Sequence, residues 1–211
     1  MLNMTNAWLV FRAALILTFQ RIGLLLVTNI LWWLLSLPLI TLPPATAGLF
    51  YVVRRLTDIN VSEQTTWRHF FEGFKYYWLK SWQLMVINLA IGAIITVSFL
   101  FYFNREQTAL RLVAVPVFYI MLLWLGMQFF LFPLLIEQEV KQLRLIFRNA
   151  LFLMARNVIF TLVLGLLLLS VILVAVTLAG PVLFILISFL AVAQPLALQQ
   201  CLTAQFESAQ R

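Results

Sequence analysis

The sequence has little charge and few of the side chains that build metal and enzyme sites. Only 10% of its 211 residues are charged, and it contains one cysteine and one histidine. A single cysteine excludes an internal disulfide, and with a single histidine it disfavours a zinc site. Soluble domains carry about 25% charged residues, so the composition also excludes an ordinary soluble domain.

Nucleophile and phosphate motifs are missing too. The chain has no Gly-x-Ser-x-Gly and no phosphate-cradling glycine loop, and its seven acidic residues are scattered. Glu137 and Glu139 form the one close acidic pair, but a spacing of two places them on different sides of a helix. We interpret them as a solvated helix end beside Lys141 and Arg144. The sequence therefore predicts no enzyme and no cofactor.

Hydrophobic residues make up 64% of the chain and are concentrated in long runs. A membrane-spanning helix needs about 20 such residues. The sequence predicts an all-α, polytopic membrane helical bundle, built as one integral membrane domain over residues 1–211. We expect a lead-in helix at 8–20 and five full spans at 22–40, 82–103, 112–136, 158–178 and 181–200.

The stretch SLPLITLPPATAGLFYVVRRL, residues 36–56, predicts a shorter element. Pro43 and Pro44 suit the first turn of a helix, and Thr41 could cap it. A helix over 44–56 would extend about 20 Å, against a hydrocarbon core of about 30 Å. We expect a half-helix that returns from within the membrane. A helix lying on the outer leaflet is the alternative.

Small residues in this half-helix would allow close approach to neighbouring helices. We expect the following residues to serve in helix packing or to line a ligand site: Pro43, Pro44, Ala45, Thr46 and Gly48.

Basic residues set the expected orientation. If the half-helix returns the chain to the cytoplasm, 12 of the 14 Lys and Arg residues lie inside. Both termini are then cytoplasmic, and Arg54, Arg55 and Lys80 are cytoplasmic anchors. The net charge of +7 matches anionic lipid better than nucleic acid, so the lipid bilayer is an expected partner and nucleic acid is not.

Polar residues within the expected spans carry no ionisable group. They are Thr28, Asn29, Asn88, Thr96, Gln128, Ser170, Ser188 and Gln194. Such side chains mostly hydrogen-bond across helices, and we favour this role over substrate binding. The missing carboxylate disfavours a proton-coupled antiporter.

Two amphipathic, basic segments at 67–80 and 141–156 precede apolar runs. Helices of this kind lie in the headgroup plane or offer a partner an apolar face. We expect a partner-docking face formed by Phe70, Phe71, Phe74, Trp78, Phe147 and Arg148.

The sequence also contains a weak internal repeat. FRAALILTF at 11–19 and FRNALFLMA at 147–155 share a pattern, and FFEGFKYYW at 70–78 has a similar rhythm. PLLIEQ at 133–138 and PLALQQ at 195–200 close the hairpins that follow. The scheme is a lead-in helix and then a membrane hairpin, three times over. Such repeats occur in transporters, but the shared needs of any lead-in helix would produce the same pattern.

The block NILWWLLSLPLITLPPATAGLFYVVRRL, followed by FFEGFKYYWLKSWQL, resembles the YesL-like family of bacterial integral membrane proteins, a domain of unknown function. The matching positions are Leu37, Pro38, Thr41, Pro44, Ala45, Gly48, Phe50, Tyr51, Arg54 and Arg55. The later stretch FFLFPLLIEQEVKQLRLIFRNALFLMARN is similar as well. The resemblance implies the bacterial cytoplasmic (inner) membrane. It also implies an association with carbohydrate-utilisation genes and ATP-binding-cassette sugar importers.

Two function hypotheses follow. The first is a non-enzymatic accessory or assembly component of a bacterial carbohydrate transport system, whose partner would be a permease or an ATPase of the ATP-binding-cassette class. The second is an autonomous small-molecule transporter or channel, in which the half-helix lines the site. A membrane enzyme ranks third. Oligomeric state does not follow from the sequence.

Overall fold

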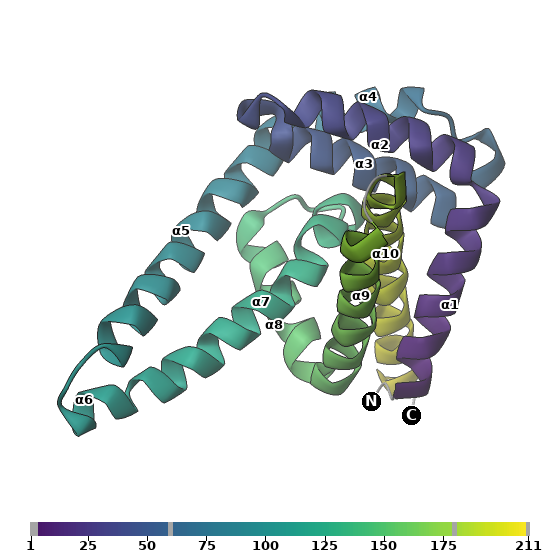
Figure 1. Cartoon of the computed structure of the whole chain (residues 1–211). Coiled ribbons are helices and arrows are strands. Elements are labelled where there is room, and N and C mark those ends of the chain that lie inside the picture. Colours follow the sequence, from purple (N-terminus) through teal and green to yellow (C-terminus); the bar gives the residue numbers. More distant parts are fainter. Residues whose placement is uncertain (1–3, 59–60, 179–180, 210–211) are drawn as a thin grey trace.

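The computed structural model describes residues 4–58, 61–178 and 181–209, and within these ranges it contains helices and no strand. Figure 1 shows the arrangement. The helices are α1 (Met4–Gln20), α2 (Ile22–Ser36), α3 (Leu42–Thr57), α4 (Arg68–Tyr76), α5 (Trp78–Phe103), α6 (Thr108–Leu112), α7 (Ala114–Glu137), α8 (Leu143–Arg156), α9 (Val158–Leu178) and α10 (Pro181–Ala209), with 3-10 turns η1 (Leu39–Thr41) and η2 (Ser62–Gln64).

Several of these helices are long and apolar enough to cross a membrane. Among the described residues, three candidates are Trp78–Phe103, Thr108–Glu137 and Ile187–Ala204. Two bent pairs, α1 with α2 and α8 with α9, raise the number to five if each pair counts as one span. The expected fold class, an all-α membrane bundle, is therefore confirmed.

Helix α2 is shorter than the apolar run that contains it. It ends at Ser36, although the run continues to residue 40. Pro38 explains the end, because it has no N–H to continue the helical hydrogen bonds and its own backbone is extended, at φ −77° and ψ 110°. The chain turns through η1 and enters α3, so the first hairpin is the shortest one.

Single-residue breaks join each lead-in helix to the helix that follows. Arg21 separates α1 from α2, Tyr77 separates α4 from α5, and Asn157 separates α8 from α9. Their backbones lie at φ −116°, ψ 27°, φ −96°, ψ 7° and φ −123°, ψ 41°, away from ordinary helical values. The helices bend by 90° at the first break and by 92° at the third.

The three breaks also share one hydrogen-bond pattern. At each break, the N–H of the break residue bonds to the carbonyl four residues earlier, and its own carbonyl accepts from four residues later. The helix is thus interrupted without leaving these backbone groups unpaired. The chain consists of three units, α1–α2–α3, α4–α5–α6–α7 and α8–α9–α10, and each unit contains one break of this construction.

Burial follows the same register in all three units. Seven residues before the break, Ala14, Phe70 and Ala150 are each 0% exposed. The residues four positions after the breaks are also buried, and they are Leu25, Ser81 and Thr161. The internal repeat of the sequence therefore corresponds to a repeat in three dimensions.

This register corrects the alignment of the middle unit. Phe11 and Phe147 both lie ten residues before their breaks, as the sequence alignment has them, but the residue equivalent to them in the middle unit is Trp67. The sequence alignment, which matched Phe70 to them, is three residues out of step there. The aromatic-rich sequence FFEGFKYY caused the shift, because several phenylalanines fit the same pattern.

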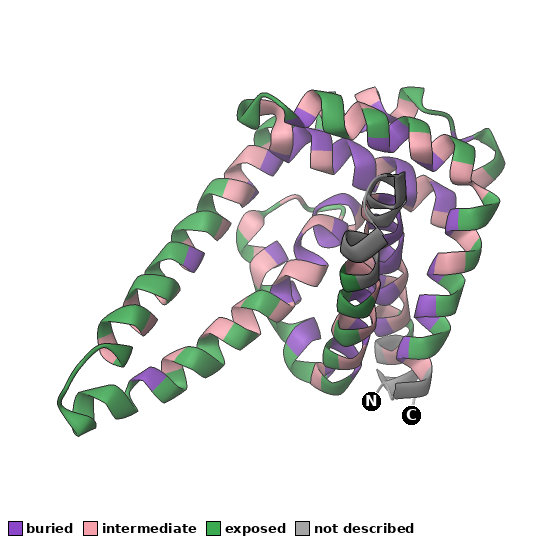
Figure 2. Cartoon of the chain, in the orientation of Figure 1, coloured by how far each residue is buried: buried purple, intermediate pink, exposed green. Residues whose placement is uncertain are grey.

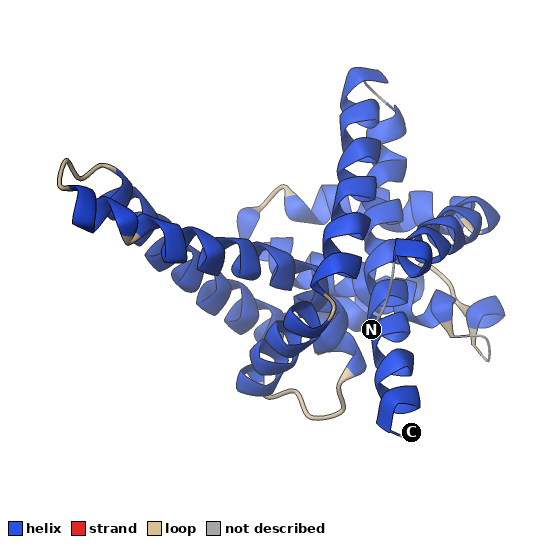
Figure 3. Ribbon diagram, turned by 90° about the horizontal axis from the view of Figure 1, so that it is seen from below, coloured by secondary structure: helices blue, strands red, loops and turns tan. Residues whose placement is uncertain are grey.

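The units pack in a cycle. Each lead-in helix lies on the last helix of another unit: α4 on α3, α8 on α7, and α1 on α10. We call α3, α7 and α10 the return helices, and each contacts the other two at the centre of the molecule. Figures 1 and 3 show the α5–α7 and α9–α10 hairpins leaving this centre in different directions. The contact of α1 with α10 closes the cycle.

Helix α3 lies inside the protein and includes the predicted half-helix at 44–56. Ten of its residues are buried, from Pro43 to Leu56, and it contacts α2, α4, α5, α7 and α10. Figure 2 shows the contrast with the largely exposed α5. Most of the surface of α3 therefore packs against other helices of the protein.

Thr41 does not cap α3 as expected. Its hydroxyl donates to the carbonyls of Leu35 and Pro38, both before the helix, and no side-chain cap bond is formed. The hydroxyl closes the turn after α2 instead. This outcome follows from Pro43 and Pro44, because the prolines lack the first-turn N–H groups that a cap would bond.

Gly48 allows α3 and α4 to approach closely. A Cβ atom built at Gly48 would lie 2.7 Å from the backbone oxygen of Phe70 and 3.3 Å from the backbone nitrogen of Phe74. Gly73 faces the same seam from α4, where an added Cβ would lie 2.5 Å from Cβ of Tyr51. The seam therefore has no room for a methyl group at either position.

We predict that Gly48→Ala destabilises the protein by about 1–3 kcal/mol, the usual cost of overpacking. The backbone of α4 would have to move, because backbone atoms are what the new methyl group meets. Gly23→Ala is the matched control, since no atom lies within 4 Å of its added Cβ. Thermal unfolding in mild detergent measures both, and equal melting temperatures for the two variants would contradict the close seam.

Candidate functional site

A polar cleft opens where α4, the middle of α3 and the end of α7 meet. It has a volume of about 860 Å³, within the usual range of small-molecule sites. Its lining is Tyr51, Glu72, Lys75, Tyr76, Tyr77, Ile136, Glu137, Gln138, Glu139 and Lys141. Three tyrosines, three carboxylates and two lysines therefore come together from segments far apart in sequence.

One residue that lines the cleft, Glu137, forms an ion pair with Arg54. The guanidinium donates from Nε to one carboxylate oxygen at 2.7 Å and from a terminal nitrogen to the other at 3.2 Å. Asp58 lies 3.5 Å from the same guanidinium. Bidentate Arg–carboxylate pairs fix geometry as well as charge, so this pair joins the ends of two return helices.

Tyr77 and Lys141 share one backbone acceptor at the floor of the cleft. The Tyr77 hydroxyl donates to the carbonyl of Ile136 at 3.4 Å, and Nζ of Lys141 donates to the same carbonyl at 2.8 Å. The ammonium also lies 5.3 Å from the centre of the Tyr77 ring, within the range of a cation–π interaction. The break residue of the second unit is thereby tied to the end of α7.

Burial shifts the pKa values of both side chains in the direction that favours the neutral form. It raises the pKa of Tyr77 to about 12, an effect that the neighbouring Tyr76 and Tyr51 reinforce. Burial also lowers the pKa of Lys141, with Glu137 opposing the shift and Arg54 adding to it. The floor of the cleft is therefore partly shielded from water.

Other charges in the cleft have no ion-pair partner. Within the described part of the chain, Glu72, Lys75 and Glu139 form no salt bridge, and all three are exposed. Their charges are available to a ligand. No group of three His, Cys, Asp or Glu side chains in the described ranges could hold a metal ion.

The expected docking residues lie on three helices, with Trp78 at the start of α5 and the others on α4 and α8, and they differ in burial. Phe70 is 0% exposed and lies in the seam against α3, so it is not available to a partner. Phe71, Phe74 and Phe147 are partly buried, whereas Trp78 and Arg148 are exposed. Because α4 and α8 pack on different return helices, the two sets belong to separate seams.

The half-helix residues serve in packing in this structure. Pro43, Pro44, Ala45 and Gly48 are buried. The hydroxyl of Thr46 accepts from Nε1 of Trp32 at 3.2 Å and donates to the carbonyl of Leu42. Replacing Gly48 by leucine would push against the α4 backbone, so that variant reports on packing rather than on a transport site.

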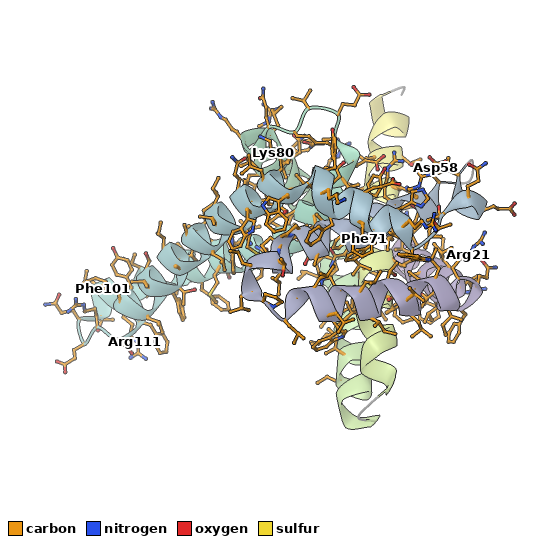
Figure 4. The ribbon with its side chains drawn as sticks, turned by 90° about the horizontal axis from the view of Figure 1, so that it is seen from above. Arg21, Asp58, Phe71, Lys80, Phe101 and Arg111 are labelled. Atoms are coloured by element: carbon orange, nitrogen blue, oxygen red, sulfur yellow. The ribbon has the colours of Figure 1, made fainter. Side chains whose placement is uncertain are left out.

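The expected anchors occupy different surroundings. Arg54 is held by Glu137, and Arg55 has a buried Nε atom for which no partner occurs among the described atoms. Lys80 is half-buried near the start of α5. Figure 4 shows Phe71 of α4 and Lys80 near the start of α5 on the main body of the molecule. Phe101 and Arg111 lie far from both, near the tip of the α5–α7 hairpin.

Some of the polar side chains expected within spans pair across helices. Asn88 of α5 and Gln128 of α7 bond to each other at 2.8 and 3.2 Å, and Nε1 of Trp124 donates to Asn88 at 3.1 Å. Asn29 of α2 differs, because both polar atoms of its buried amide lack a hydrogen-bond partner among the described residues.

The cleft itself was missed by the sequence analysis. Glu137 and Glu139 looked like a solvated helix end, and the partner of Glu137 lies 83 residues away. The available signal was the pairing of a tyrosine-rich segment, FKYYW, with a charged one, IEQEVK. Only the cyclic packing of the units brings the two together.

We predict that Tyr77 titrates late, with a pKa of about 12. A raised pKa stabilises the fold below the unfolded value of about 10 and the stabilisation is lost as the pH rises to about 12. Tyr77→Phe should remove this late component of the tyrosinate absorbance titration. Tyr76→Phe, a change in an exposed neighbour, should leave the late component in place. A late component that survives in Tyr77→Phe would contradict the burial of this hydroxyl.

Comparison with known proteins gives one match. The model of a family described as "Protein of unknown function, DUF624" matches residues 25–99, which run from α2 through most of α5 and include the α3–α4 seam. No curated protein matches the chain, and no solved structure matches it. Over these residues the chain is similar to a domain family without an assigned function.

Proposed function

We propose that the protein is a non-enzymatic accessory or assembly component of a bacterial carbohydrate transport system, located in the bacterial cytoplasmic membrane. The resemblance of its Pro-Ala-Thr-Ala block to the YesL-like family supports the link to carbohydrate uptake. The absence of nucleophile and phosphate-binding motifs from the sequence supports a non-enzymatic role. The partner is a permease or an ATPase of the ATP-binding-cassette class.

The observation that carries the proposal is the two-sided character of α4. Its inner face, with Phe70 and Gly73, is locked into the seam with α3. Its outer side leaves Trp67 45% and Tyr76 73% exposed, and the Arg68 guanidinium lies 5.7 Å from the centre of the Trp67 ring. A rigid helix that exposes aromatic and basic side chains suits the docking of a partner with an acidic surface, because aromatic residues and arginine dominate binding hot spots.

The charge distribution supports an orientation with α4 and α8 in the cytoplasm. Both helices carry basic residues, whereas the α5–α7 hairpin carries Arg105 and Arg111 at its opposite end. The positive-inside rule then places the outer side of α4 at the cytoplasmic headgroup level. A soluble ATPase or the cytoplasmic loops of a permease would meet it there.

A second candidate is an autonomous small-molecule transporter or channel. The observation favouring it is Asn29, a buried amide without a partner among the described residues. An unsatisfied buried amide costs about 1–3 kcal/mol, and a second conformation or a bound substrate would offset that cost. Flux into liposomes through the purified protein alone would favour this candidate over the accessory role.

We predict that Trp67→Ser/Arg68→Glu releases the transporter subunit that purifies with the tagged protein in mild detergent. Loss of a hot-spot aromatic and reversal of a charge should lower recovery about tenfold or more. The matched control is Phe101→Ser/Arg105→Glu, which removes a similar exposed pair, 4.0 Å apart, at the far end of α5.

Quantitative mass spectrometry of the purified samples measures the recovery of the subunit against the tagged protein. A monodisperse elution profile for each variant shows that its fold is intact. The accessory proposal fails if no transport protein purifies with the wild type, or if both double variants retain it equally.

A further inference from the structure

The polar cleft lies at one end of the α5–α7 hairpin. Tyr77, in its floor, immediately precedes α5, and Glu137, in its wall, ends α7. Both helices are long enough to cross the hydrocarbon core. One end of this hairpin therefore meets the membrane surface at the cleft, and the tip meets the other surface.

The charged side chains that line the cleft and form no ion pair are balanced in sign. Arg54 neutralises Glu137, which leaves Glu72 and Glu139 as carboxylates and Lys75 and Lys141 as ammonium groups. Two negative and two positive side chains give no net preference for an anion or a cation. A ligand that carries one charge of each sign would satisfy both kinds of group.

Aromatic rings add a second preference for a cationic group. Tyr76 and Tyr77 meet edge to face at 4.7 Å, and Tyr51 lies 6.2 Å from Tyr77. Ring faces attract ammonium groups, and the neighbouring carboxylates can accept their hydrogen bonds. Exposed apolar side chains, Leu79 and Val140, flank the lining in sequence and suit the start of an acyl chain.

We propose that this cleft binds a phosphoethanolamine group, supplied by a phosphatidylethanolamine lipid at the membrane surface. Lys75 and Lys141 hold the phosphate, and Glu72 and Glu139 accept hydrogen bonds from the ammonium beside the tyrosine rings. A primary ammonium donates three hydrogen bonds and a trimethylammonium donates none, so choline lipid should bind less tightly. Phosphatidylglycerol lacks the cation altogether and should bind least.

Delipidated wild-type protein in mild detergent provides the test. Native mass spectrometry measures the binding of added phosphatidylethanolamine, phosphatidylcholine and phosphatidylglycerol with identical acyl chains. We expect the ethanolamine lipid to bind about fivefold or more tightly than the glycerol lipid, since one charge-assisted hydrogen bond is worth at least that ratio. Equal binding of the two lipids, or tighter binding of the glycerol lipid, would overturn the proposal.

Variants locate the site. Glu72→Gln/Glu139→Gln should remove the preference for the ethanolamine lipid. Glu63→Gln/Glu106→Gln, which changes two exposed carboxylates outside the cleft, should keep it. Retention of the preference in the first double variant, or its loss in both, would overturn the assignment to this cleft. Thermal unfolding of each variant shows whether the fold is retained.

A soluble headgroup identifies the source of the ligand. Glycerophosphoethanolamine that competes with the lipid at equal concentration supports the same chemistry, but with a free metabolite as the ligand. Failure to compete supports the lipid. Because these measurements need no partner protein, their outcome is independent of whether the accessory role in transport is correct.

Discussion

The close contact between each lead-in helix and a return helix of another unit is the constraint on which the rest of the structure depends. At the α3–α4 seam a glycine on each helix removes the Cβ that would hold the backbones apart. In lipid, apolar side chains gain little by leaving the solvent, so close van der Waals packing has to hold helices together. The seam can therefore tolerate very little added volume.

The breaks at Arg21, Tyr77 and Asn157 follow from that constraint. A lead-in helix that lies along a neighbouring unit has to turn before its chain can enter the membrane. Each break makes the turn while keeping its backbone groups bonded. The same geometry creates the polar cleft, because the break at Tyr77 lies against the end of α7 and its ion pair, Arg54 with Glu137.

Composition and periodicity were enough to predict the helical membrane fold, because runs of apolar residues depend on local sequence alone. The short α3 could also be predicted, since Pro43, Pro44 and the arginines mark its two ends. The role of Phe70 in the seam between α3 and α4 could not be predicted from the sequence. Its place in the sequence fits an exposed amphipathic face, and only the packing on Gly48 shows that it points inward. The cleft required long-range knowledge for the same reason, because Arg54 and Glu137 lie on different units.

Closure of the cycle by α1 and α10 is the most direct test of this account. Ala13 and Gln200 line one shared pocket between these helices. With Cys201, the one native cysteine, replaced by serine, Ala13→Cys/Gln200→Cys should form an intramolecular crosslink with a short bifunctional maleimide in native membranes. Ala13→Cys/Val97→Cys, which places the second thiol on the exposed side of α5, should not. Absence of the first crosslink, although both thiols react with a single maleimide, would contradict the cyclic arrangement.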